Sequence, residues 1–352
     1  MRLAIVGCGL IGRKRSFAAT GHEIVIVCDR DEVRARELAE ITKARATTDW
    51  REAIMTDVDA VIVATTHDQL AGIAIGAIEA GRHVLVEKPA GRTLAEAQAI
   101  AAAAAKHKRI AKAGFNHRFH PAFLKAREIV DSGVLGPLMF IRARYGHGGR
   151  IGYEKEWRAQ PVISGGGELI DQGSHLIDLS RWFLGDLAVD YAAVPTLFWN
   201  MEADDNCFMA LRSAAGRLAW LHASWTEWKN TFSFEIFGRD GKLVIDGLGG
   251  SYGLERLTFY RMLPQMGPPE TTTFEYPGQD QSWDTEFAEF VSAVSDNRPP
   301  CGDIADAVAN LAIVDEIYRR YRPCSSCAPP YAFRSVAAAP TCLPTIGIMA
   351  AS

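Results

Sequence analysis

Two hydrophobic patterns alternate along the first 115 residues of the chain. Short runs that are almost continuously apolar and rich in β-branched residues predict strands buried on both faces of a parallel sheet. These runs occupy residues 2–7, 23–29, 59–65 and 82–88. Stretches with helical spacing separate them, beginning at Asp31, near Leu70 and at Thr93. Alternating strands and helices require right-handed crossovers, so this half predicts a doubly wound α/β sheet.

The pattern changes after Asn116. An amphipathic helix over about 121–131 precedes strand-like runs that are joined by turns, at 137–145, 206–212, 216–225, 231–238 and 241–247. Because most of these strands follow one another without a helix, this half predicts an α+β domain with a large, mainly antiparallel open sheet. One helix near 166–184 is inserted before the sheet continues. Two further helices, at roughly 281–295 and 303–320, follow the last of these strands.

Composition and charge narrow the class of protein. The 352 residues are 48% hydrophobic and 23% charged, which is the balance of a soluble globular chain. The formal net charge of -4 gives no basic excess, so we expect neither a nucleic-acid nor a membrane partner. No apolar run is long enough to span a bilayer, and the seven cysteines are scattered. We therefore expect a cytoplasmic protein with reduced thiols.

A glycine-rich segment follows the first predicted strand. Residues 7–12 read Gly-Cys-Gly-Leu-Ile-Gly, and Asp29 closes the second strand 20 residues after Gly9. This context predicts a dinucleotide-binding Rossmann fold, in which Gly7, Gly9 and Gly12 shape the turn and the backbone at Leu10 and Ile11 receives the pyrophosphate. Asp29 would bind the ribose hydroxyls and repel a 2′-phosphate, which favours NAD. Arg30 beside it partly offsets that charge, so NADP stays the alternative.

A second group of residues is suited to acid–base catalysis. Glu87-Lys88-Pro89 ends the fourth strand, at the sheet edge where ligands bind, and packing explains a lysine there poorly. Asp171 and His175 follow three consecutive glycines and stand four residues apart on a predicted helix. Because they share one face, they are better acid–base candidates than a lone histidine.

These motifs occur together with GFNHRFHP at 114–121 and with the stretch at 157–185. In that order and spacing, over about residues 1–320, the chain resembles the Gfo/Idh/MocA oxidoreductases, the relatives of glucose–fructose oxidoreductase and inositol dehydrogenase. The resemblance implies NAD(P)-dependent hydride transfer between nicotinamide and a secondary alcohol or ketone. The substrate would be a sugar, cyclitol or nucleotide sugar, and the protein a homodimer or homotetramer.

The resemblance also implies roles for particular residues. His175 would remove the hydroxyl proton, Lys88 would stabilise the substrate oxygen, and Asp171 would orient the neighbouring hydroxyl and the imidazole. Asn116 and Arg118 would join these three in contacting the substrate. Besides the fingerprint, Asp29 and Arg30, the expected cofactor contacts are Ala64, Thr65, Thr66, His67, Glu87, Lys88, Trp157 and Arg158.

One segment departs from the family pattern. Thr66 stands where a proline is usual, and Leu70 stands where a histidine is usual. His67, one turn earlier, either replaces that histidine or caps the following helix. His117 and His120 likewise either touch substrate or serve as capping or exposed residues. The segment 144–157 is either a substrate loop or a solvated one.

The chain is expected to divide into three segments. Residues 1–118 would form the dinucleotide-binding domain, residues 119–321 the substrate-binding and oligomerisation domain, and residues 322–352 a loosely ordered tail. The tail contains one C-x-x-C pair, Cys324 and Cys327, which is too little for a zinc site, and no metal is predicted.

Two other functions remain compatible with the sequence. Some relatives use bound NAD for transient oxidation, so the chain could be an NAD-assisted glycoside hydrolase. Because a fold alone does not fix a function, a non-catalytic NAD(P)-binding protein is the third interpretation.

Overall fold

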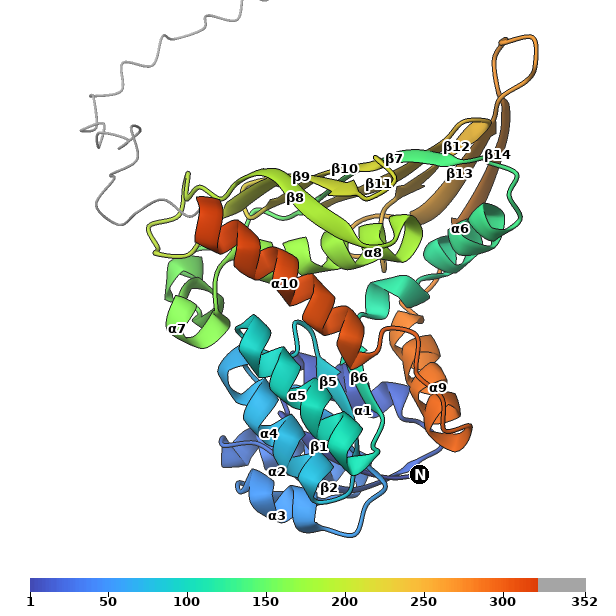
Figure 1. Cartoon of the computed structure of the whole chain (residues 1–352). Helices are drawn as coiled ribbons and strands as arrows, with labels where there is room; N and C mark the ends of the chain where they lie inside the picture. The colour runs from blue at the N-terminus through green and yellow to red at the C-terminus, as the bar shows by residue number, and fades with distance from the viewer. Residues whose placement is uncertain (322–352) are drawn as a thin grey trace, which may run out of the picture. The chain divides into compact units, whose positions relative to one another are not determined.

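The structure is a computed structural model that describes residues 1–321 (Figure 1). The predictions for 322–352, including Cys324 and Cys327, lie outside the described residues. No helix in the described part is both long and apolar enough to cross a membrane.

The first half forms a six-stranded parallel sheet, which confirms the predicted doubly wound fold. The strand order is β3-β2-β1-β4-β5-β6. Its strands are β1 (Arg2–Val6), β2 (Glu23–Cys28), β3 (Arg45–Thr47), β4 (Ala60–Val63), β5 (His83–Glu87) and β6 (Ala111–Gly114). The order reverses at β1 and β4, which places a ligand crevice at their carboxyl ends.

Helices cover both faces of this sheet because alternate strand residues are apolar on both sides. The helices are α1 (Leu10–Ala18), α2 (Glu32–Thr42), α3 (Trp50–Met55), α4 (His67–Glu79) and α5 (Leu94–His107). Ala4 and Val6 pack with α3, α4 and α5, whereas Leu3 and Ile5 pack with α1, α2 and a late helix, α9 (Ser282–Ser295). The helix α9 therefore completes the core of the first sheet, although it follows the second sheet in the chain.

The second sheet has eight strands in the order β14-β13-β12-β11-β7-β10-β9-β8. Its strands are β7 (Leu138–Gly146), β8 (Leu187–Ala193), β9 (Asn206–Ser213), β10 (Leu218–Ser224), β11 (Thr231–Gly238), β12 (Gly241–Asp246), β13 (Glu255–Arg261) and β14 (Glu270–Tyr276). The pair β7–β10 is parallel and the other pairs are antiparallel, so the mainly antiparallel prediction is confirmed. The boundary at 118/119 stays a prediction.

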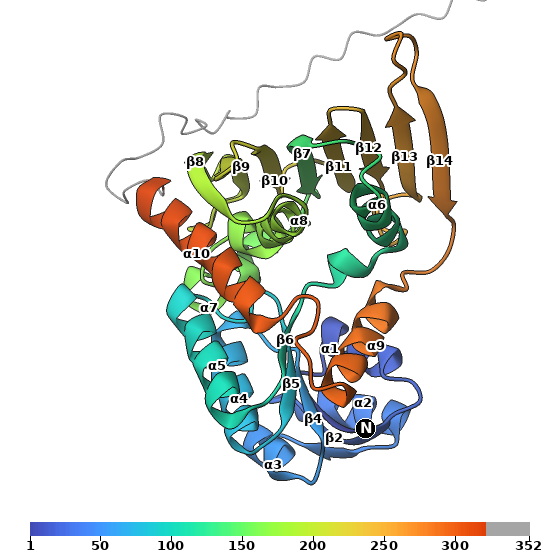
Figure 2. The same ribbon diagram turned by 45° about the vertical axis from the view of Figure 1, so that its right-hand side comes forward.

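Helices cover one face of the second sheet, the face turned toward the parallel sheet (Figure 2). They are α6 (Pro121–Asp131), α8 (Ser174–Leu184) and α10 (Ile304–Tyr321). The short elements between the sheets are η1 (Asn116–Phe119), η2 (Tyr153–Lys155), η3 (Trp157–Ala159), α7 (Pro161–Ser164) and the π-helix η4 (Leu169–Gly173). The single helix expected near 166–184 is thus divided into η4 and α8.

Four buried charged side chains join α1, β5, β6 and α9. Arg15 donates to Glu87 at 2.6 Å and to Glu286 at 2.5 Å, and Lys112 lies 3.2 Å from Glu286. Burial alone would lower the pKa of Arg15, but Glu286 and Glu87 outweigh it and raise that pKa. Each charge is therefore tolerated in the core only because its partners are present.

Removing Arg15 should destabilise the fold strongly. We expect Arg15→Met to lower the free energy of unfolding by about 3–5 kcal/mol, since two carboxylates would be left buried with less compensation. Urea unfolding followed by tryptophan fluorescence measures this. The control Arg36→Met breaks an exposed pair with Glu32 on α2 and should cost about 0.5 kcal/mol. Equal losses of unfolding free energy in the two variants would contradict the stabilising role of the four buried charged side chains.

Candidate active site

A cavity of about 510 Å³ lies where the two sheets face each other. Its lining includes Ala64 and Thr65 after β4, Lys88 after β5, and Tyr145 of β7. The carboxyl edge of the parallel sheet therefore forms one wall, and the second sheet contributes to the other. This is the usual place for a ligand site in a doubly wound fold.

The glycine fingerprint has the geometry of a phosphate cradle. A side chain at Gly7 would lie 2.3 Å from the Ala64 carbonyl oxygen, and one at Gly12 would lie 1.8 Å from the Gly7 carbonyl oxygen. A side chain at Gly9 would meet nothing within 4 Å, so this face of the turn is open. The first turn of α1 has neither a side-chain cap nor an acidic residue, which leaves its amides available to an anion. The local structure fits a dinucleotide.

Asp29 ties the fingerprint to the end of β2. Its Oδ2 accepts from the Cys8 amide at 2.8 Å, and its Oδ1 accepts from the Asp31 amide at 2.9 Å. The carboxylate is thereby fixed beside the turn. Arg30 follows it directly and lies outside the cavity lining, as does Thr66.

His67 at the start of α4 is buried and lines the cavity. Its Nδ1 lies 2.8 Å from the Ser164 carbonyl oxygen, and its ring meets the Trp157 ring edge-on at 4.8 Å. Burial, helped by the charge of Lys88, lowers its pKa to about 4, so the ring is neutral. No side chain caps this helix, which removes the capping interpretation of His67. Leu70, at the usual histidine position, is buried in the core.

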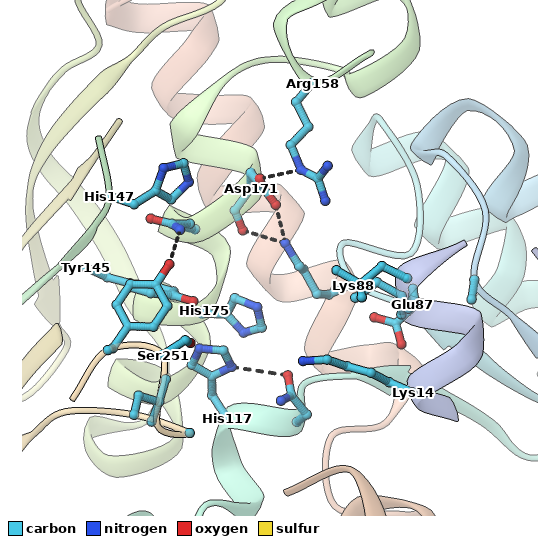
Figure 3. Close-up of a pocket in the computed structure, with 18 of the residues that line it drawn as sticks. Lys14, Glu87, Lys88, His117, Tyr145, His147, Arg158, Asp171, His175 and Ser251 are labelled. Atoms are coloured by element: carbon cyan, nitrogen blue, oxygen red, sulfur yellow. Dashed lines mark hydrogen bonds and ion pairs between the residues drawn. The ribbon is translucent and has the colours of Figure 1, made fainter. Parts of the chain in front are cut away.

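A chain of charges crosses the cavity from Lys88 to Arg158 (Figure 3). Lys88 Nζ donates to Asp171 Oδ1 at 2.5 Å and to the Asp171 carbonyl oxygen at 2.9 Å. Arg158 Nε donates to Asp171 Oδ2 at 2.9 Å. Burial would raise the pKa of Asp171, but Lys88 and Arg158 outweigh it and hold that pKa well below its usual range. Asp171 is thus a permanent anion that positions both cations.

His175 lies in the same cavity but makes different contacts from those expected. It is 5% exposed, and its Nδ1 has no hydrogen-bond partner among residues 1–321. Both Asp171 carboxylate oxygens are bound to Lys88 and Arg158, so the expected support of the imidazole by Asp171 is not found. The cause is local: Asp171 belongs to η4 and His175 to α8. Burial and Lys88 lower the pKa of His175 well below its usual value, despite the opposing effect of Asp171.

The two residues that the GFNHRFHP segment led us to expect at the substrate lie in different places. Asn116 lines the cavity, and its amide contacts Ser282 and His117. Arg118 is buried outside the cavity lining, where it donates to Asp178 at 2.6 Å and to Asp306 at 2.9 Å. The expected substrate contact of Arg118 is therefore corrected, because its charge is neutralised between α8 and α10.

Other lining residues were not singled out from the sequence. They are Gln172, Leu248, Gly249, Ser251, Tyr252, Asp280 and Trp283. Gln172 Nε2 donates to the Tyr252 hydroxyl at 3.1 Å, which places two polar groups in the cavity wall. Tyr252 lies in a glycine-rich loop without a period, so no pattern pointed to it. The 144–157 segment does line the cavity, through Tyr145, His147, Arg150, Tyr153, Glu156 and Trp157. In the described part, no cluster of His, Cys, Asp and Glu could hold a metal.

Family models match both halves of the chain. The oxidoreductase family with an NAD-binding Rossmann fold matches residues 1–115, and the GFO/IDH/MocA C-terminal domain matches residues 123–244. Levoglucosan dehydrogenase of Pseudarthrobacter phenanthrenivorans is 26% identical over 70% of this chain and 73% of its own length. Inositol 2-dehydrogenase 2 of Saccharopolyspora erythraea is 31% identical over 55% of this chain and 56% of its own length.

Solved structures agree with the fold. Levoglucosan dehydrogenase in complex with NADH and levoglucosan has a TM-score of 0.82 at 23% identity, covering 91% of this chain and 96% of that one. A protein from gentamicin A biosynthesis in complex with NAD has a TM-score of 0.77 at 27% identity, covering 91% of this chain and 93% of that one. With models of both domains matched over more than half of its length, the chain belongs to the Gfo/Idh/MocA family of oxidoreductases.

Proposed function

We propose that this protein is an NAD-dependent dehydrogenase or ketoreductase acting on the CH–OH groups of a sugar, cyclitol or nucleotide sugar. The observation on which this depends is the convergence of Lys88, Asp171 and a neutral His175 in one cavity beside the open glycine turn. Relatives named for levoglucosan, inositol and 1,5-anhydro-D-fructose support this substrate class.

The cofactor would be held by groups along the edge of the parallel sheet. The amides at the start of α1 would bind the pyrophosphate, Asp29 the adenosine ribose, and the loop from Ala64 the nicotinamide half. Trp157, Arg158 and Glu87 line the same cavity and are further candidates. When bound, NAD supplies the hydride acceptor.

His175 would serve as the general base in alcohol oxidation. Its Nδ1 is enclosed, so Nε2 would take the hydroxyl proton as hydride leaves the same carbon. Lys88 would donate to the substrate oxygen and stabilise its developing negative charge. Asp171 holds Lys88 against the cavity wall, and Arg158 binds the other carboxylate oxygen of Asp171. In ketone reduction the proton would return from His175 to the oxygen.

The outer face of the second sheet supports self-association. Phe140 stacks on Phe237 there, Trp220 is 55% exposed and Leu218 is 39% exposed. Apolar residues on an open sheet face favour a partner surface, so we propose a homodimer or homotetramer. The charge balance opposes a nucleic-acid partner, and we propose a cytoplasmic location.

Cofactor binding is the first measurement. Titration with NADH and with NADPH, followed by energy transfer from the tryptophans, should show at least about tenfold tighter NADH binding, roughly 1.4 kcal/mol. Asp29→Asn should weaken NADH binding and reduce this preference, because the repelling charge is lost. Asp57→Asn, an exposed carboxylate at Arg2, is the matched control. A wild-type preference for NADPH would reassign the cofactor, and failure to bind either would exclude the proposed reaction.

Loss of His175 or Lys88 should slow turnover strongly without preventing cofactor binding. On a panel of levoglucosan, inositol, 1,5-anhydro sugars and nucleotide sugars, His175→Ala and Lys88→Met should lower kcat about 10²–10⁴-fold. Lys106→Met, an exposed lysine of α5, should leave kcat unchanged. Full activity in His175→Ala would remove it as the base. Glycoside release without net NADH formation would instead identify the hydrolase.

The pH dependence follows from the lowered pKa of His175. Its neutral form is the base, so kcat/KM for oxidation should rise as pH passes that pKa and reach its plateau below the ordinary value of about 6.5. Because Asp171 raises the pKa of His175, Asp171→Asn should move the acid limb to still lower pH. Initial rates across a pH series test both points. An acid limb above 6.5 would contradict them.

A further inference from the structure

The imidazole of His175 is stacked on a second histidine. The rings of His117 and His175 lie face to face, with centroids 3.6 Å apart and planes inclined by 24°. Both residues are buried, and they come from different elements, η1 and α8 (Figure 3). A catalytic imidazole is commonly oriented by a hydrogen bond at its second nitrogen. His175 has no such bond at Nδ1 within the described chain.

The other rings around His175 are farther away. Phe115 meets it edge-on at 6.5 Å between centroids, and Tyr145 does so at 6.2 Å. Among the described aromatic contacts of His175, the stack on His117 is thus the closest. The direction of the imidazole plane therefore depends mainly on where the His117 ring is held.

A directed chain of hydrogen bonds holds the His117 ring. The Asp280 carboxylate accepts from the Ser282 hydroxyl at 2.6 Å. His120 and the hydrogen bonds of Asp280 lower the pKa of this carboxyl below its ordinary value, despite burial. The Ser282 oxygen is then free to accept from Asn116 Nδ2, at 3.0 Å. Asn116 Oδ1 consequently faces His117 Nδ1, at 3.2 Å. Since an amide oxygen only accepts, the proton of neutral His117 is on Nδ1.

The surroundings keep His117 uncharged. Burial lowers its pKa well below the usual value, and the charges of His175, His120, Lys88 and Lys14 act in the same direction. Two charged imidazoles in face-to-face contact would repel each other. A neutral His117 therefore permits the stack to persist when His175 receives a proton. Tyr145 and Asp171 are further ionisable groups near the two rings.

We propose that His117 is a positioning residue that orients the His175 imidazole by stacking, with its own ring fixed by the Asp280–Ser282–Asn116 chain. This inference rests on the proposed function, in which His175 is the base. It gives Asn116 a supporting role and explains why His175 can be oriented without a hydrogen bond from Asp171.

Three variants separate stacking from general stability. His117→Leu removes the flat ring and should lower kcat at least about tenfold, because small displacements of a reacting group are costly. His117→Phe keeps a flat ring but loses the hydrogen bond to Asn116, so its loss of kcat should be smaller, about threefold. Ser282→Ala keeps the imidazole but breaks the chain that holds it, so its loss should be of similar size. In all three the KM for NAD should stay unchanged.

A matched control is His222→Leu. His222 stacks on Phe208 with centroids 4.1 Å apart, outside the cavity, so its loss should leave kcat unchanged. Wild-type kcat in His117→Leu would overturn the proposal. So would a His117→Phe variant as slow as His117→Leu, because the ring would then not be what orients His175.

A second readout needs no turnover. Nitrogen NMR of the full chain labelled with ¹⁵N-histidine should show His117 protonated on Nδ1, assigned by the signals lost in His117→Phe. The His175 signals should stay narrow in His117→Phe and broaden or split in His117→Leu. A wild-type His117 protonated on Nε2 would overturn the proposal even if NADH binds. Failure of NADH binding, with these NMR results intact, would refute the proposed function alone.

Discussion

The buried ion pairs of Arg15 with Glu87 and Glu286 constrain the rest of the site. Arg15 belongs to the fingerprint helix, Glu87 directly precedes Lys88, and Glu286 belongs to α9. Because a buried charge is stable only beside its partners, these three elements must meet in one arrangement. The glycine turn and Lys88 are thereby fixed relative to each other. The first turn of α9 includes Ser282, so the histidine pair depends on the same arrangement.

A second set of ionic contacts joins the first sheet to the helices under the second. Lys88 reaches from the end of β5 to Asp171 in η4, and Arg158 approaches Asp171 from η3. These contacts use both carboxylate oxygens of Asp171, which leaves the imidazole of His175 to be oriented by ring packing. This arrangement agrees with electrostatics, because the charge of Lys88 needs an anion nearby and the neutral imidazole of His175 does not.

The π-helix at Leu169–Gly173 allows Asp171 to bind the two cations while His175 packs against a ring. An unbroken α-helix would place Asp171 and His175 one turn apart on a single face, as their spacing suggested. The wider turn of η4 interrupts that periodicity just before α8, and such turns are frequent at functional sites. Arg118 also differs from what its motif indicated, which was a place near the substrate. Carboxylates of the helices α8 and α10 bind it outside the cavity lining instead.

The hydrophobic pattern predicted both sheets, and the motifs predicted the glycine turn with Asp29 and the grouping of Lys88, Asp171 and His175. These features can be predicted from hydrophobic period and motif spacing, because strand burial and turn geometry depend on neighbours in the chain. The pairing of side chains depends on the folded chain: Arg15 pairs with Glu286, Asp171 with Arg158, and His117 with His175. Such pairs join residues from different elements, and their energy depends on distance and burial, which no local pattern contains.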